Sequence, residues 1–195
     1  MPPNTPPFTL AIGLGSNMRS SVGDPASTLV VVRKELEELI SEWIDQSKKG
    51  NINAINNVNH EALRWRWSPL FETEPLGGPK GQNRFINAVL VVDGERLQSL
   101  KPSKQDALIL LQRFLTLEKK YGRDREQESI KWGPRTIDID FLAWGGLQVQ
   151  NETLTIPHPR LIERNFVIVP LAAAITTKEN TPKEIIHLGW PESKE

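Results

Sequence analysis

Four short apolar runs and two long helical patterns alternate along this chain, and their order limits the folds that it can adopt. The runs are rich in β-branched and aromatic residues and end at glycine, proline or asparagine, as strands do. They occupy residues 8–17, 64–73, 84–94 and 136–145. Apolar residues recur at helical spacing over about 24–44 and 103–122. The predicted order is therefore strand, helix, strand, strand, helix, strand.

This order of elements is the split βαβ arrangement of the ferredoxin-like class, a βαββαβ unit. We therefore expect an α+β sandwich with an antiparallel sheet and a C-terminal extension. The residues of the first helix expected to face the core are Leu29, Val32, Leu36, Leu39 and Ile40.

The second predicted helix has a signal at each end. Ser103 followed by Asp106 is a capping-box pattern, and Gly122 suits the position where the helix stops. The leucines expected on its buried face are Leu108, Leu111, Leu115 and Leu117.

We expect one domain over residues 9–195, preceded by a flexible, proline-rich tail over residues 1–8. Residues 46–64 are polar and rich in asparagine, with too little apolar surface to offset the entropy of ordering. A loop insertion is therefore predicted there. The chain beyond the last strand-like run contains a proline-bounded loop over 155–165 and an apolar run that Phe166 is expected to open as a strand.

The charge balance excludes a whole-molecule attraction to nucleic acid or an anionic membrane, because 24 lysines and arginines match 24 aspartates and glutamates. Cysteine is absent, so neither a disulfide framework nor a thiolate metal site is available. The apolar runs are far shorter than the roughly 18 residues that a membrane span needs. The start lacks the basic and apolar parts of a signal peptide. We expect a cytoplasmic protein with no membrane and no nucleic-acid partner.

An acidic pair interrupts the last strand-like run, "TIDIDF" over residues 136–141. Side chains two residues apart on a strand point to one face, so Asp138 and Asp140 project together while Ile139 faces the core. Two such carboxylates repel each other unless a cation lies between them. Mg²⁺ takes carboxylate oxygens together with waters and substrate phosphates. From these residues alone, the solvated face of an edge strand explains the pair equally well.

Basic residues crowd the segment that leads into the acidic pair, namely Arg123, Arg125, Lys131 and Arg135. Arginines clamp phosphate oxygens bidentately, so such a cluster beside two carboxylates suits a Mg²⁺–polyphosphate site. A salt-bridged surface loop is the alternative. Familiar nucleotide motifs are absent, because Met18 stands where the dinucleotide motif after Gly13 and Gly15 needs glycine, and no Gly-Lys pair of a phosphate loop occurs.

A histidine and two phenylalanines complete the candidates. His158 lies between two prolines in a loop, although most lone loop histidines are merely exposed. Phe85 and Phe166 could sandwich a flat heterocycle and gain roughly 1 kcal/mol each by stacking. Packing in the core is the alternative for both rings. The spacing of the three histidines does not suit zinc.

Four blocks together resemble the family of 6-hydroxymethyl-7,8-dihydropterin pyrophosphokinases, enzymes of the folate pathway. The blocks are "AIGLGSN" (11–17), "ETEPLGGPKGQNRFINAV" (72–89), "GRDREQESIKWGPRTIDIDFL" (122–142) and "TIPHPRLIERNFVIVPLA" (155–172). Their order and spacing agree with the family, and "WGPRTIDID" is highly specific to it. The resemblance covers residues 9–17 and about 65–172.

The resemblance implies a ferredoxin-like enzyme that uses Mg²⁺ to transfer diphosphate from ATP to the pterin, with release of AMP. It implies that Asp138 and Asp140 bind two Mg²⁺ ions, and that Arg123 and Arg135 contact phosphate as catalytic residues. The implied ATP-binding residues are Glu118, Arg125, Trp132, His158 and Arg164. The implied pterin-binding residues are Thr73, Leu76, Phe85, Asn87 and Phe166.

Two other classes stay open from the residues alone. A ferredoxin-like module could bind single-stranded RNA by stacking bases on Phe85 and Phe166, although the balanced charge disfavours it. A metal-dependent nucleotidyltransferase or glycosyltransferase could use the Asp-x-Asp pair to hold a metal–nucleotide complex. We expect a monomer that binds ATP and 6-hydroxymethyl-7,8-dihydropterin.

Overall fold

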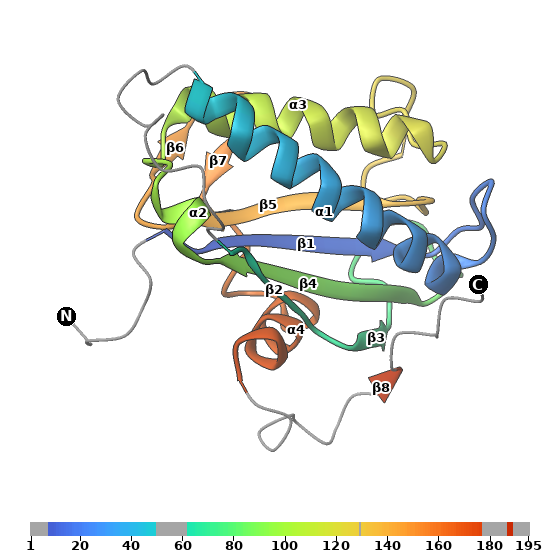
Figure 1. Ribbon diagram of the computed structural model, residues 1–195. Helices are drawn as coiled ribbons and strands as arrows, with labels where there is room; N and C mark the ends of the chain where they lie inside the picture. The colour runs from blue at the N-terminus through green and yellow to red at the C-terminus, as the bar shows by residue number, and fades with distance from the viewer. Residues whose placement is uncertain (1–7, 50–61, 129, 177–186, 189–195) are drawn as a thin grey trace.

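A six-stranded antiparallel sheet with helices on both faces forms the body of the protein, as the computed structural model shows for residues 8–49, 62–128, 130–176 and 187–188 (Figure 1). The elements in chain order are β1 (Leu10–Ser16), α1 (Pro25–Lys49), β2 (Arg64–Trp67), β3 (Leu70–Thr73), β4 (Phe85–Asp93), α2 (Glu95–Gln98), α3 (Lys104–Lys120), β5 (Asp138–Trp144), β6 (Val149–Gln150), β7 (Thr155–Ile156), α4 (Asn165–Ile175) and β8 (His187–Leu188). Strands β6 and β7 form a separate two-stranded sheet.

The strand order of the six-stranded sheet confirms the predicted ferredoxin-like fold. It runs β5-β1-β4-β3-β8, and β2 pairs with β4 in line with β3. Every pairing in this sheet is antiparallel, and β1 lies between β4 and β5. The acidic strand β5 is thus at one edge of the sheet.

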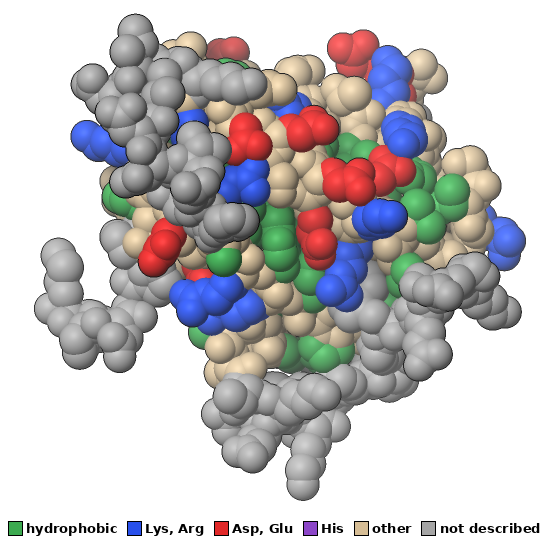
Figure 2. Space-filling view, viewed as in Figure 1, with side chains coloured by type: hydrophobic (Ala, Val, Ile, Leu, Met, Phe, Trp, Pro, Cys, Tyr) green, Lys and Arg blue, Asp and Glu red, His purple; other side chains and the backbone are tan. Residues whose placement is uncertain are grey.

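Helices α1 and α3 cover one face of the sheet (Figure 1). Alternate residues of β1 point to this face, and Leu10, Ile12 and Leu14 are buried in its core. The predicted stripe of α1 packs onto them, as its helical spacing requires. At the end of this core the rings of Trp43 and Trp144 meet edge to face, with centroids 5.0 Å apart. Acidic and basic side chains are intermixed on the outer surface of this side (Figure 2).

The opposite face carries α4 and a much smaller apolar cluster (Figure 1). Val167 and Ala174 of α4 pack there against β1, β4 and β5. The remaining part of this face is open to the cavity described below.

The prediction that Phe166 opens a strand is wrong, because Phe166 lies in the first turn of α4. A short apolar run such as "FVIVPLAAA" fits a buried strand and a buried helix equally well. The open face of the sheet offers apolar surface for a helix to cover, and burial of Val167 and Ala174 there favours the helix even though Pro170 lies inside it.

Residues 64–73, predicted as one strand, form two. At the break, Ser68 donates its N–H to the carbonyl of Val89 at 2.9 Å, and its hydroxyl accepts from the Val89 N–H at 2.9 Å. Pro69 has no N–H to continue the ladder. The interruption divides the run into β2 and β3.

Both predicted long helices form, and each differs from its prediction in one detail. The cap of α3 is confirmed, because the Ser103 hydroxyl accepts from the Asp106 N–H at 3.1 Å and Gly122 follows with a φ of 90°. Its buried face is shifted, however. Of the four predicted leucines only Leu117 is buried, and the other three are half-buried. The residues that face the core are Ala107, Leu110, Phe114, Leu117 and Glu118.

Helix α1 continues to Lys49, so the first four residues of the predicted loop over 46–64 are helical. Residues 50–61 of that loop, and residues 1–7 of the predicted tail, lie outside the described residues. In the part of the chain that the structure describes, no helix is both long and apolar enough to cross a membrane.

Candidate active site

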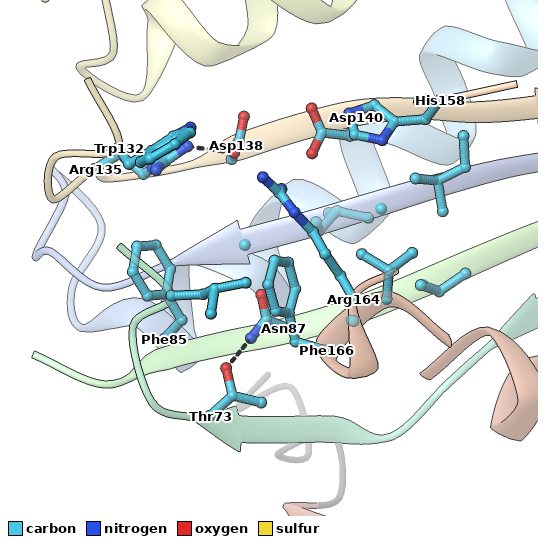
Figure 3. A pocket seen from close by; sticks show the side chains of 18 of the residues that line it. Thr73, Phe85, Asn87, Trp132, Arg135, Asp138, Asp140, His158, Arg164 and Phe166 are labelled. Carbon is cyan, nitrogen blue, oxygen red and sulfur yellow. Dashed lines mark hydrogen bonds and ion pairs between the residues drawn. The ribbon is translucent and has the colours of Figure 1, made fainter. Parts of the chain in front are cut away.

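A cavity of about 230 Å³ opens on the α4 side of the sheet, over the ends of β1, β4 and β5 (Figure 3). Two loops border it, here called the glycine loop (residues 74–84) and the arginine loop (residues 122–128 and 130–137). All the predicted site residues except Glu118 line this cavity, namely Thr73, Leu76, Phe85, Asn87, Arg123, Arg125, Trp132, Arg135, Asp138, Asp140, His158, Arg164 and Phe166.

The acidic pair projects from β5 into the cavity (Figure 3). The residues between and beside the aspartates, Ile137, Ile139 and Phe141, point the other way and are buried in the core under α3. The period of two along the strand therefore places both carboxylates on one face, as the sequence predicts.

Three arginines surround Asp138. Arg135 donates to its Oδ2 at 2.6 Å, Arg125 donates to its Oδ1 at 3.2 Å, and Arg123 forms an ion pair with the same Oδ1. Burial by itself would raise the pKa of Asp138, but the charges of the three arginines outweigh it and hold that pKa below its usual range. Asp138 is therefore ionised at neutral pH.

Asp140 differs from its neighbour in having no such partners. Among the described residues, no hydrogen bond or ion pair reaches its carboxylate, since those of the arginines go to Asp138. Burial, followed by the negative charge of Asp138, raises the pKa of Asp140. A cation beside both carboxylates would remove this conflict.

The donor set fits Mg²⁺ better than zinc. The described residues contain no group of three or more histidines, cysteines, aspartates or glutamates placed to hold a metal ion. Two hard carboxylate oxygens leave further positions to waters and phosphate oxygens, which is how Mg²⁺ is usually bound in proteins.

Glu118, which the resemblance places in the ATP site, lies instead beneath the cavity with a fully buried side chain. Its Oε1 accepts from Arg123 at 3.1 Å and from Arg125 at 2.7 Å, and its Oε2 accepts from Arg125 at 2.7 Å. Oε1 also accepts from the backbone N–H of Ile139 at 2.7 Å, between the two aspartates. Glu118 thus anchors the arginines and the acidic strand from behind.

Two glycines of β1 form part of the cavity lining. Gly13 and Gly15 point to the cavity side, opposite Ile12 and Leu14. A Cβ at Gly15 would lie 3.1 Å from the side-chain oxygen of Asn87, closer than nearly all such contacts. Gly15 therefore lets the polar end of Asn87 approach the sheet.

Polar and aromatic groups line the end of the cavity near β3 and β4 (Figure 3). Asn87 donates to the hydroxyl of Thr73 at 2.7 Å, which orients its amide. The rings of Phe85 and Phe166 both line the cavity, and a guanidinium lies over each of them. Arg135 is 5.4 Å from the Phe85 centroid, and Arg164 is 5.3 Å from the Phe166 centroid.

His158 presents one ring nitrogen to its own loop. Its Nδ1 accepts from the backbone N–H of Arg160 at 3.2 Å, and the backbone N–H of His158 donates to the carbonyl of Leu142 at 2.8 Å. Burial, followed by the positive charge of Arg164, lowers the pKa of His158. The neutral ring with an accepting Nδ1 carries its proton on Nε2, which is thereby a hydrogen-bond donor.

The sequence reasoning missed several groups that shape the site. Asn17 accepts from the Arg135 N–H at 2.8 Å through its side chain, and its own N–H donates to the Arg135 carbonyl at 3.0 Å. Gln82 donates to the carbonyls of Gly77 and Trp132, at 3.2 and 3.1 Å. Asn17 is the last residue of the "AIGLGSN" block and Gln82 lies in the block over residues 72–89. Their polar side chains inside these two blocks were the signal that could have identified them.

The fold and cavity define a class of α+β protein in which one face of a ferredoxin-like sheet joins paired carboxylates, arginines and an aromatic pocket. Residues 11–176 match the family model for 7,8-dihydro-6-hydroxymethylpterin-pyrophosphokinase (HPPK). The chain belongs to this family.

The chain is also similar to several curated proteins named 2-amino-4-hydroxy-6-hydroxymethyldihydropteridine pyrophosphokinase. It is 51% identical to that of Synechocystis sp. over 107 residues, which cover 55% of this chain and 48% of the relative. It is 44% identical to that of Methylorubrum extorquens over 98 residues, covering 50% of this chain and 54% of the relative. These matches thus span about half the length of the relatives.

A longer match extends along most of the chain. The Aquifex aeolicus protein of the same name is 32% identical over 163 residues, which cover 84% of this chain and 78% of the relative. The chain is also 34% identical over 143 residues to a folate synthesis bifunctional protein of Arabidopsis thaliana, covering 69% of this chain and 27% of that protein.

Proposed function

We propose that this protein transfers diphosphate from ATP to the hydroxymethyl group of 6-hydroxymethyl-7,8-dihydropterin in a Mg²⁺-dependent reaction that releases AMP. The observation that carries the proposal is a single cavity in which a carboxylate pair faces a cluster of arginines, with an aromatic and amide pocket at its other end. Family membership and the names of the relatives support the same activity.

Asp138 and Asp140 would hold two Mg²⁺ ions. When bound, Mg²⁺ supplies positive charge that neutralises the diphosphate and the departing AMP. Both carboxylates face the cavity, and among the described residues the arginines pair with Asp138 alone. The negative charge left on Asp140 supports this assignment.

The basic groups would align the triphosphate chain. Arg123 and Arg135 serve as the catalytic cations that contact the transferring phosphates, and transfer of this kind depends mainly on alignment and charge stabilisation. Arg125, Arg164 and the Nε2–H of His158 add further donors for ATP. Glu118 acts on ATP only indirectly in this scheme, by holding Arg123 and Arg125 in place.

The pterin would occupy the other end of the cavity. Phe85 and Phe166 can stack on the two faces of its ring, and the Asn87 amide can bond to its polar edge. Thr73 orients that amide, and Leu76 adds an apolar edge to the pocket. The hydroxymethyl group would then point toward the acidic strand.

The arginine loop would exclude water during transfer, since Trp132 lies at the cavity and contacts the glycine loop. Water excluded in this way cannot hydrolyse ATP in place of the pterin hydroxyl.

The decisive assay measures AMP release from ATP and Mg²⁺ with and without 6-hydroxymethyl-7,8-dihydropterin. We expect AMP in equal amount to the pterin diphosphate formed, only traces without pterin, and none after chelation with EDTA until Mg²⁺ is restored. Release of inorganic diphosphate would instead identify a nucleotidyltransferase. Salt-sensitive binding of single-stranded RNA without AMP release would identify the binding module.

We further propose that the protein works in the cytoplasm as a monomer, with small molecules rather than nucleic acid or a membrane as its partners. The equal numbers of acidic and basic residues, and their mixing on the surface in Figure 2, support this proposal. Light scattering would test the monomer, and retention on heparin at low salt would contradict the absence of a polyanionic partner.

A further inference from the structure

Trp132 is the point at which three loops around the cavity meet. Trp132 belongs to the arginine loop, and a Cβ at Gly77 of the glycine loop would lie only 2.9 Å from its ring. Its carbonyl accepts from Gln82 of the same glycine loop at 3.1 Å. From the third loop, between β7 and α4, the guanidinium of Arg160 lies 4.9 Å from the centroid of the Trp132 ring.

The backbone of Trp132 needs such contacts. Its φ is 58°, in the left-handed region, and among the described residues it is the only non-glycine residue with a positive φ. A bulky residue persists in this conformation only where its surroundings hold it there. Trp132 is 40% exposed, so burial in a core does not supply the restraint.

Arg160 has no competing partner for its charge in the structure that we describe. No carboxylate of the described residues lies within ion-pair distance of its guanidinium, and its backbone N–H is engaged with His158. Lys131 also places its ammonium 4.9 Å from the Trp132 ring, but it is the adjacent residue of the same loop. Among the described residues, the contact of Arg160 with the ring is the only hydrogen bond, ion pair or ring contact that connects the arginine loop to the loop before α4.

We propose that Arg160 is a positioning residue that fastens the arginine loop across the cavity through a cation–π contact with Trp132. The inference rests on the proposed function, because the fastened loop is what would keep water from the phosphates. Arg160 does not line the cavity itself, so it acts through Trp132 and does not contact the substrates.

The first test follows the loop directly and needs no activity. Hydrogen exchange is measured by mass spectrometry on peptides that contain Trp132, in the wild type and in Arg160→Gln, Arg160→Lys and Lys131→Gln. We expect about two- to fivefold faster exchange in Arg160→Gln, the range of an exposed cation–π contact, and partial rescue in Arg160→Lys. Exchange in Lys131→Gln should stay at the wild-type rate, because that change removes no link between loops.

The second test distinguishes an action through the ring from a general attraction of phosphate. The kcat and KM for AMP release are measured in Arg160→Gln, Trp132→Ala and the double variant. We expect Arg160→Gln to lower kcat two- to fivefold in the wild type and to have no further effect when Trp132 is absent. The proposal would be overturned if Arg160→Gln lowered kcat equally with and without Trp132. It would also be overturned if Arg160→Gln exchanged at the wild-type rate, or if Lys131→Gln exchanged as fast as Arg160→Gln.

The outcomes separate this inference from the proposed function. A wild type that releases no AMP would refute the proposed function, while the exchange rates would still decide whether Arg160 fastens the loop. A wild type that is active, with no dependence on Arg160, would refute the fastening alone. Thermal unfolding of each variant verifies that the comparisons concern folded protein.

Discussion

The two faces of the sheet are built from the same strands but have different roles, one as the hydrophobic core and the other as the candidate site. Under α1 and α3 the face is covered, and its buried apolar residues belong to one continuous core. Under α4 the apolar cluster is small, and the rest of the face is a cavity lined by charged, polar and aromatic groups. Ile139 and Asp140 are neighbours on β5, yet one is core and the other is site. Stability and chemistry are therefore separated by the alternation of a strand rather than by distance.

This separation predicts that changes on the two faces have different consequences. Substitutions toward α1 and α3 should lower stability and leave the activity of each folded molecule nearly intact. Substitutions toward the cavity should lower activity at little cost in stability.

The largest effect is expected for Asp140→Asn, which should reduce AMP release about a thousandfold, or about 4 kcal/mol in the transition state, since it would remove one of the two proposed Mg²⁺ ligands. Thermal stability should stay the same or rise, because the change also removes the repulsion from Asp138. Steady-state kinetics at limiting Mg²⁺ and thermal unfolding measure the two quantities. Near wild-type turnover in this variant would refute the metal assignment.

The matching change on the core face is Ile139→Ala. The Ile139 side chain is 1% exposed, so its truncation should lower the free energy of unfolding by about 3 kcal/mol. Ile139→Val, as the graded control, should cost about 1 kcal/mol. Urea unfolding gives both values, and kcat of the folded fraction should change less than twofold. A loss of kcat as large as that of Asp140→Asn would show that the two faces are not separable.

A smaller effect is expected at the glycines of β1. Gly15→Ala should raise the KM for the pterin about five- to tenfold, the equivalent of one hydrogen bond, because the new Cβ pushes on the Asn87 oxygen. Gly13→Ala is the matched control, since its Cβ would meet only the Leu142 side chain, at 3.4 Å. Equal KM values in the two variants would contradict the role of Asn87 in the pterin pocket.

The smallest effect concerns Glu35, at the rim of the helical side. Lys120 donates to both its oxygens, at 2.8 and 2.7 Å, and Tyr121 donates to one of them at 2.6 Å. Burial opposes ionisation, but these bonds and the Lys120 charge lower the pKa of Glu35. A carboxylate with a lowered pKa stabilises the fold above its unfolded pKa, and this stabilisation is lost as the pH falls through the folded pKa.

Glu35→Gln should therefore cost less than about 1 kcal/mol at pH 7, and the difference from wild type should shrink below about pH 4. Unfolding by urea at both pH values measures it, with the exposed Glu38→Gln as control. If the difference in unfolding free energy between wild type and Glu35→Gln grew at low pH, the pKa of Glu35 would be raised by folding and not lowered.

Local sequence patterns predicted the parts of the molecule that depend on neighbours along the chain. The period of two in "TIDIDF" placed Asp138 and Asp140 on one face, and Ser103 began its helix because the cap needs only residues three positions away. Every residue that lines the cavity lies within the four blocks of the resemblance.

The patterns failed where distant segments decide the outcome. The run after Arg164 is apolar on all sides, and only the open face of the sheet makes it a helix. Glu118 is a buried acid, which the helical period does not predict, because its partners Arg123 and Arg125 come from the following loop and Ile139 from β5. Arg160 likewise gains its neighbour Trp132 only through the meeting of loops.

The bond from the Ile139 amide to Glu118 has a consequence beyond catalysis. β5 is the edge strand of its sheet, and bare edge amides are templates on which foreign strands assemble. The buried Glu118 carboxylate occupies one of these edge amides near the start of β5, so a foreign strand cannot pair with it there. A variant lacking the Glu118 carboxylate should therefore lose solubility on storage as well as turnover. The same group that holds the arginines also keeps the β5 edge from pairing with the edge of another molecule of this protein.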